Sequence, residues 1–113
     1  MDIEITEHKG EGYLTLVKFQ NWRVAIANYS KDFERTDPPK MERHLETDET
    51  FVLLEGDVTL LVGEEKKEYK LEKDKVYNIK KGVWHSVIIA PGGKTLIIEN
   101  SDTGGKNTER KIF

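Results

Sequence analysis

Residues 42–56 read ERHLETDETFVLLEG and place a histidine among carboxylates, directly before an apolar segment. The apolar run Phe51–Leu54 has the length of a short strand and is followed by a turn at a glycine. Successive side chains of an extended segment point to opposite faces, so Glu42 and His44 share one face. Glu49 lies beyond a short turn, and we expect the returning strand to bring its carboxylate back alongside His44.

Alternation with a period of two residues runs through most of the chain and predicts an all-β fold. Glycine or proline stands at nearly every joint between the apolar segments, as in Pro91-Gly92-Gly93. About eight or nine short strands at this spacing are typical of a small antiparallel sandwich or barrel. The expected strands are 13–19, 22–29, 50–54, 58–62, 66–71, 76–79, 84–90 and 94–99, with a loop at about 30–40.

The length of 113 residues predicts a single domain over 1–113, since domains of about 100–150 residues are the commonest. Residues 1–10 are expected to form an N-terminal strand or arm. Residues 101–113 are expected to form a polar C-terminal tail.

Composition excludes several classes of protein. The chain has no cysteine, so a disulfide framework, a zinc–thiolate site and a thiol nucleophile are excluded. The net charge of −3, without a basic cluster of useful size, argues against nucleic acid as a partner. No apolar run approaches the roughly 20 residues of a membrane span, and the N-terminus is unlike a signal peptide. A cytoplasmic protein with no membrane partner is expected.

Several expected strands are apolar on both faces, among them 51–54 and 87–89. One face of such a strand fills the interior of a small barrel, and the other needs a cover. We therefore expect a homodimer.

The candidate site combines Glu42, His44 and Glu49 with His85, which lies on a separate expected strand. Two imidazoles and two carboxylates suit a divalent transition metal such as zinc, iron, manganese, nickel or cobalt. The alternative is that His44 is a half-exposed strand histidine that only makes hydrogen bonds. Spacing by itself does not choose between the two.

Two segments resemble the paired motifs of the cupin superfamily. In the first segment, four residues separate His44 from Glu49 and six separate Glu49 from Gly56. This spacing is similar to that of the first motif, His-x-His-x(3–4)-Glu-x(6)-Gly. Residues 79–85, IKKGVWH, are similar to the second, Pro-x-Gly-x-x-His. With the flanking strands, the resemblance covers most of 13–99 and implies a small jelly-roll barrel.

The chain departs from the family pattern at five positions. Glu42 stands where the first motif has its first histidine, and Thr36 where that motif has its leading glycine. In the second motif, Asp74, Lys80 and Ile89 replace a glycine, the proline and the closing asparagine.

The resemblance implies metal ligation by His44, Glu49 and His85. Glu42 is a ligand only by substitution, and its carboxylate is otherwise placed to act as a general base, the catalytic residue.

Met41–His44 and Gly82–His85 also resemble segments of ureidoglycolate lyases, cupin-fold enzymes that release glyoxylate and urea. The resemblance implies a metal-dependent lyase or isomerase that acts on a small hydroxy- or keto-acid through the divalent metal. The alternative is a non-catalytic module that binds a sugar or an organic acid.

Other side chains near the motifs are expected to lie outside the candidate site. Arg43 and Trp84 are out of phase with the neighbouring histidines and are expected to face away from the site. His8 is expected to be structural or exposed. The sequence does not place Arg23, Arg35 or Lys18, which are further candidates for contact with a substrate.

Overall fold

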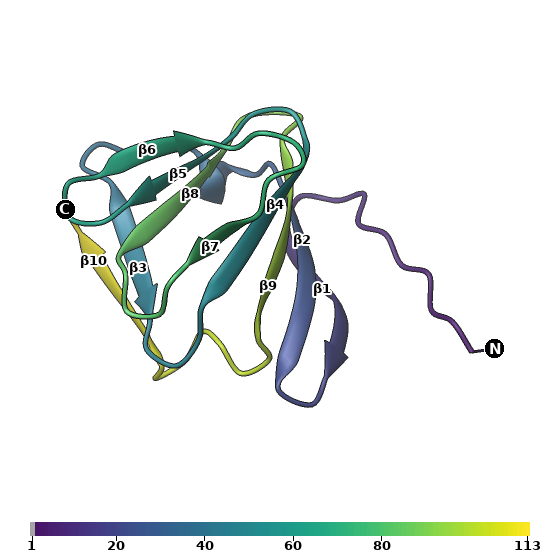
Figure 1. Ribbon diagram of the computed structural model, residues 1–113. Coiled ribbons are helices and arrows are strands. Elements are labelled where there is room, and N and C mark those ends of the chain that lie inside the picture. Colours follow the sequence, from purple (N-terminus) through teal and green to yellow (C-terminus); the bar gives the residue numbers. More distant parts are fainter. Residues whose placement is uncertain (1) are drawn as a thin grey trace.

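The computed structural model describes residues 2–113 as two antiparallel five-stranded sheets that face each other (Figure 1). This confirms the all-β, jelly-roll fold, although the sheets do not close into a complete barrel. Among residues 2–113, no helix is long and apolar enough to span a membrane. The elements are β1 (Gly12–Phe19), β2 (Trp22–Asn28), the 3-10 helix η1 (Lys31–Phe33), β3 (Lys40–His44), β4 (Glu49–Glu55), β5 (Val58–Val62), β6 (Lys67–Lys70), β7 (Tyr77–Ile79), β8 (His85–Ile89), β9 (Lys94–Asn100) and β10 (Thr108–Ile112).

The strand orders are β1-β2-β9-β4-β7 in one sheet and β10-β3-β8-β5-β6 in the other. Strands that are distant in the sequence are therefore neighbours, as in the pairing of β3 with β8 and of β2 with β9. This order places β3, β4, β8 and β9 away from the sheet edges, where their side chains can meet between the two layers.

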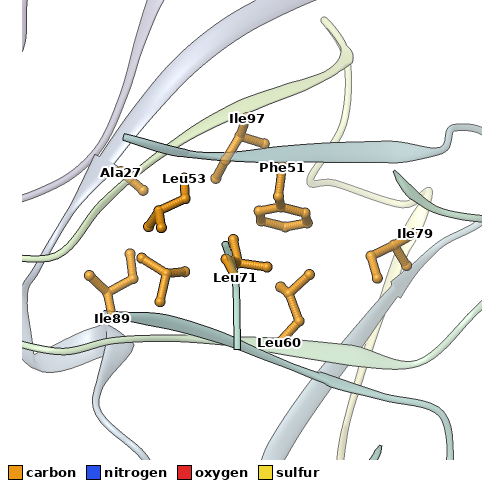
Figure 2. Close-up of a cluster of buried hydrophobic side chains, with 9 residues drawn as sticks. Ala27, Phe51, Leu53, Leu60, Leu71, Ile79, Ile89 and Ile97 are labelled. Carbon is orange, nitrogen blue, oxygen red and sulfur yellow. The ribbon is translucent and has the colours of Figure 1, made fainter. Parts of the chain in front are cut away.

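The hydrophobic core lies between the sheets, and alternation along β4 builds part of it (Figure 2). In β4, Phe51 and Leu53 are buried while Val52 and Leu54 are only half-buried. The inward set therefore fills the interior, as the period of two predicts. The buried cluster consists of Ala27, Phe51, Leu53, Val58, Leu60, Leu71, Ile79, Ile89 and Ile97.

The N-terminal segment, for which a strand or an arm was expected, has the form of an arm over residues 2–9. Residues 2–9 form no strand and run away from the two sheets (Figure 1). His8, near the base of this arm, is nevertheless buried, and its Nε2 lies 2.8 Å from the Gly12 carbonyl oxygen. The arm is thus fixed at its junction with β1.

The C-terminal segment differs from the expected polar tail. Thr108–Ile112 form β10, which pairs with β3 in a register that sets Thr108 opposite His44 and Arg110 opposite Glu42. The sequence concealed this strand because four of its five side chains are exposed. Its position depends on the backbone hydrogen-bond ladder rather than on apolar alternation.

The turn after β4 depends on a glycine that lies close to a neighbouring backbone segment. Gly56 has φ of 67°, and a Cβ atom there would lie 2.8 Å from the Gly92 carbonyl oxygen. Gly82, before β8, also has positive φ, 82°, but no atom lies within 4 Å of the position of its missing Cβ. The two glycines therefore share a backbone requirement and differ in crowding.

We predict that Gly56→Ala destabilises the fold by more than about 3 kcal/mol: about 1–2 kcal/mol from the left-handed backbone and the rest from overpacking. Gly82→Ala is the matched control and should cost only the backbone contribution, about 1–2 kcal/mol. Urea unfolding of both variants measures the difference. Equal destabilisation would show that the turn is not crowded at Gly56.

Candidate metal centre

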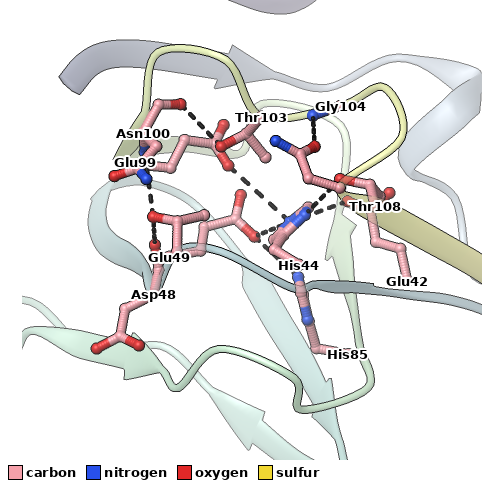
Figure 3. Close-up of polar contacts among 12 residues, drawn as sticks. Glu42, His44, Asp48, Glu49, His85, Glu99, Asn100, Thr103, Gly104 and Thr108 are labelled. Atoms are coloured by element: carbon pink, nitrogen blue, oxygen red, sulfur yellow. Dashed lines mark hydrogen bonds and ion pairs between the residues drawn. The ribbon is translucent and has the colours of Figure 1, made fainter. Parts of the chain in front are cut away.

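Four ionisable side chains from both sheets converge between the layers (Figure 3). Glu42 and His44 come from β3 and His85 from β8 in one sheet, while Glu49 comes from β4 in the other. Glu42 pairs directly with His85 across β3 and β8. One ligand atom from each of the four lies within 4.8 Å of all the others. Glu42 therefore points inward, which the sequence had left open.

The distances within this group suit a single ion. Glu49 Oε1 lies 3.0 Å from His44 Nε2 and 2.8 Å from His85 Nε2. Glu42 Oε1 lies 3.6 Å from His44 Nε2. Metal bonds to nitrogen and oxygen are about 2.0–2.2 Å, so neighbouring ligands of one ion are separated by about 3 Å. Small side-chain adjustments would thus admit a metal among these atoms.

The second nitrogen of each imidazole has a partner that orients the ring. His85 Nδ1 lies 3.0 Å from the Val83 carbonyl oxygen, which can only accept a hydrogen bond. His44 Nδ1 lies 2.9 Å from Thr108 Oγ1, which comes from β10. In both rings Nε2 faces Glu49, where it donates a hydrogen bond to the carboxylate, and loss of that proton would free the Nε2 lone pair for an ion. This is the arrangement that supports histidine ligands in metal sites.

The electrostatics of the group are dominated by Glu49. Burial raises the pKa of Glu49, but hydrogen bonds from His44 and His85 outweigh burial and lower the pKa to about 2. Burial lowers the pKa of His85, and the Glu49 carboxylate more than reverses this, so that the net pKa is raised. The carboxylate therefore stays ionised and favours a positive charge among the side chains that surround it.

Glu99 was not among the residues singled out from the sequence, yet it adjoins the group. It lies beside Glu49 across β4 and β9, is only 5% exposed, and has Oε1 3.9 Å from His44 Nε2. Burial, and then the charge of Glu49, raise the pKa of Glu99. Because β9 is apolar on both faces, its alternation did not show which way Glu99 points. The available signal was its phase, shared with buried Thr95 and Ile97.

The remaining candidates lie outside the group. Arg43 stacks over the Trp84 ring at 4.6 Å and pairs with Glu109 at 2.6 Å. Arg35 forms an ion pair with a surface glutamate, and Lys18 is exposed. Arg23 is the exception, since its guanidinium bonds to Glu99 at 3.0 Å.

A pocket of about 460 Å³ opens onto the group from one side. Glu42, Glu49 and His85 form part of its wall, whereas His44 and Glu99 do not reach it. The pocket also contains cationic residues from β3 and β10, namely Lys40, Arg110 and Lys111. The centre thus has an open side toward the pocket and a closed side toward Glu99.

The arrangement can be compared with that of known proteins. A family model described as the cupin domain matches residues 34–98, which is more than half of the chain. The sequence matches no curated protein.

Among solved structures, a cupin-2 domain protein from Shewanella frigidimarina superposes with a TM-score of 0.63 at 20% identity, covering 83% of this chain and 84% of its own. The Streptomyces protein Pac13, a nucleoside dehydratase, gives a TM-score of 0.68 at 6% identity, covering 95% and 85%. FeII HppE in complex with substrate gives 0.61 at 18% identity, covering 85% of this chain and 56% of HppE.

These structural likenesses concern the fold, and they agree with the family match. The matched residues 34–98 include Glu42, His44, Glu49 and His85 and all the strands from β3 to β8. The paired motifs, the two facing sheets and the match over residues 34–98 lead to one conclusion: the chain belongs to the cupin domain family.

Proposed function

We propose that the chain is a metal-dependent enzyme, a lyase or isomerase that acts on a small hydroxy- or keto-acid. The observation that carries this proposal is the group of two imidazoles and two carboxylates beside a pocket of about 460 Å³. The donor set suits zinc, iron, manganese, nickel or cobalt as a divalent ion. When bound, such an ion would polarise a carbonyl or hydroxyl group of the substrate as a Lewis acid.

The metal ligands in this proposal are His44, His85 and Glu49. All three side chains are buried, and both histidine Nε2 atoms lie within 3.0 Å of Glu49 Oε1. Their close approach brings a carboxylate between two imidazoles, and an ion there would satisfy all three at once.

Glu42 has a different position and therefore a choice of roles. Its side chain is 37% exposed, lines the pocket, and has Oε2 3.5 Å from Arg110 Nε. A carboxylate on the open side of the centre is within reach of a substrate, where it can accept a proton. It is also close enough to the imidazoles to be a ligand.

Three cationic side chains in the pocket wall support an acidic substrate, beside three acidic ones, Asp32, Glu42 and Glu49. Arg110 is 66% exposed, and only its Nε is paired with Glu42, so the outer edge of its guanidinium remains available to a second carboxylate. Lys40 and Lys111 add positive charge at the same opening. A small acid could thus place its carboxylate against Arg110 and its hydroxyl or carbonyl group toward the imidazoles.

The similar structures support small-molecule chemistry without choosing the reaction. Pac13 is described as a nucleoside dehydratase, and HppE as an iron protein in complex with a substrate. The likeness of Met41–His44 and Gly82–His85 to ureidoglycolate lyases favours cleavage of a small acid.

The competing proposal is a non-catalytic module that binds a sugar or an organic acid. It is favoured by the departures from the second motif, Lys80 for proline and Ile89 for asparagine. Both classes predict a filled pocket, but only the first requires a metal.

Protein purified without a chelator should contain one equivalent of transition metal, measured by elemental analysis. His44→Ala and His85→Ala should lose it while their circular dichroism stays that of a folded β protein. His8→Ala is the matched control, because His8 lies at the base of the N-terminal arm, bonded to Gly12. Absence of metal under every loading condition would favour the binding module.

Glu42→Gln separates the two roles of that residue. If Glu42 is the general base, the variant keeps its metal and loses turnover by about 100-fold or more. If Glu42 is a ligand, metal affinity falls together with activity. Unchanged metal content and unchanged turnover would remove Glu42 from the mechanism.

We also propose that the protein is a cytoplasmic homodimer, formed through the outer face of the sheet β1-β2-β9-β4-β7. Leu14, Phe19, Trp22 and Ile98 are exposed large apolar side chains on this sheet. Cross-strand pairs of Phe19 with Trp22, and of Val24 with Ile98, make the face continuous across three strands.

Sedimentation velocity at micromolar concentration should report a dimer for the unmodified chain and a monomer for Ile98→Glu. Val76→Glu is the control, since Val76 is 70% exposed but lies outside this sheet's strands. A monomer for the unmodified chain would refute the proposed interface.

A further inference from the structure

Glu99 is a buried acid for which the proposed chemistry has no use. Its Oε2 accepts hydrogen bonds from Tyr13 Oη at 2.6 Å and from Arg23 at 3.0 Å. Its Oε1 is buried and has no hydrogen-bond partner among residues 2–113. A buried polar oxygen without a partner is costly, and native structures contain few of them.

The unpartnered oxygen points toward the candidate metal centre. Glu99 Oε1 lies 3.9 Å from His44 Nε2, and the side chain is seen beside Glu49 and His44 in Figure 3. With metal bonds of about 2.1 Å, two ligands on opposite sides of one ion are up to about 4.2 Å apart. The separation is therefore compatible with one ion shared by His44 and Glu99.

We propose that Glu99 supplies a further carboxylate oxygen to the metal centre, on the side away from the pocket. This inference rests on the proposed metal binding and extends it to a residue outside the cupin motifs. Glu99 would close the inner side of the centre, while the pocket side stays open for the substrate.

The surroundings of Glu99 hold it for this role. Arg23 also bonds to the carbonyl oxygens of Ser101 and Thr103, at 3.2 and 3.1 Å, so its guanidinium is fixed by the chain between β9 and β10. The Arg23 side chain is 18% exposed and lies 5.4 Å from the centre of the Tyr13 ring. Tyr13 and Arg23 are thus positioning residues that hold Oε2 and leave Oε1 directed at the centre.

The charges around the centre also leave room for a cation, because Glu49 is the one of its three carboxylates that no arginine in residues 2–113 pairs with. Glu49 and Glu99 are two buried carboxylates on adjacent strands, and Arg23 pairs with Glu99 alone. Glu42 adds a third carboxylate, paired with exposed Arg110. A divalent ion among these groups would offset the remaining negative charge.

An additional oxygen donor also bears on which metal fits. Glu99 would be a fifth side-chain donor beside the four that converge, one more than the four ligands of a tetrahedral zinc site. Carboxylate-rich sites of higher coordination number suit ions such as Mn²⁺ and Fe²⁺. The centre would then be five- or six-coordinate before any substrate binds.

Titration with Co²⁺ tests the inference, because four-coordinate Co²⁺ absorbs visible light much more strongly than five- or six-coordinate Co²⁺. Glu99→Gln should weaken Co²⁺ binding by about tenfold or more, the loss typical of residues that support a metal site. Its visible bands should grow more intense as the coordination number falls. Glu109→Gln is the matched control, since Glu109 is a half-exposed acid that pairs with Arg43 away from the centre.

Thermal unfolding of the metal-free proteins separates this role from a purely structural one. A metal-binding Glu99 leaves its buried Oε1 without a partner when the metal is absent, so metal-free Glu99→Gln should be at least as stable as the unmodified protein. If Glu99 only anchors Arg23, the variant should be less stable and should bind Co²⁺ normally. That result would overturn the inference.

The remaining outcomes are also decisive. If Glu99→Gln does not fold, Tyr13→Phe replaces it, and several-fold weaker Co²⁺ binding is expected because the carboxylate is less firmly held. Co²⁺ affinity and absorption equal to those of the unmodified protein, in whichever variant is used, would overturn the inference while leaving the metal site intact. If the unmodified protein binds no Co²⁺, the proposed function fails and the inference fails with it.

Discussion

The contact on which the site depends is that of one carboxylate oxygen, Glu49 Oε1, with two imidazoles. It lies within 3.0 Å of both His44 Nε2 and His85 Nε2, and it joins the two sheets across their shared interior. A carboxylate so deeply buried stays ionised only because the two histidines outweigh the cost of burial. Because the imidazoles are aligned by Thr108 and Val83, both Nε2 atoms meet at this same oxygen.

The fold explains why such a contact is possible in a chain of only 113 residues. The β3–β8 pairing sets Glu42 and His85 side by side, and the facing β4 supplies Glu49 from the opposite sheet. The apolar cluster around Phe51 fills the interior next to the site, with the Phe51 ring 6.4 Å from the His85 ring. The polar group is therefore surrounded by a rigid apolar wall on one side and by a pocket on the other.

Much of this could be predicted from the sequence, because the relevant signals are local. Alternation located β4, and the turn expected at the glycine that follows it is found at Gly56, where φ is positive. The two motifs identified His44 and His85 together, although forty-one positions separate them in the numbering. Phase along the strand placed Arg43 and Trp84 away from the histidines, and they stack on each other outside the group.

The parts that the sequence did not show depend on non-local pairing. β10 is polar and exposed, so no periodic pattern in the sequence indicated a strand there. It nevertheless supplies Thr108, which contacts His44 Nδ1, and Arg110, which lines the pocket. Glu99 lies next to the end of a strand that is apolar on both faces, and its neighbours Tyr13 and Arg23 come from a hairpin more than seventy residues earlier. The β1–β2 and β2–β9 pairings together bring these three side chains to one place.

The central claim is that Glu49, His44 and His85 share one metal ion, and anomalous diffraction from crystals soaked in Mn²⁺ tests it most directly. The account predicts one strong anomalous peak within about 2.0–2.3 Å of Glu49 Oε1 and of both Nε2 atoms. A map without a peak at that position, in which Glu49 still bonds directly to the two imidazoles, would contradict it.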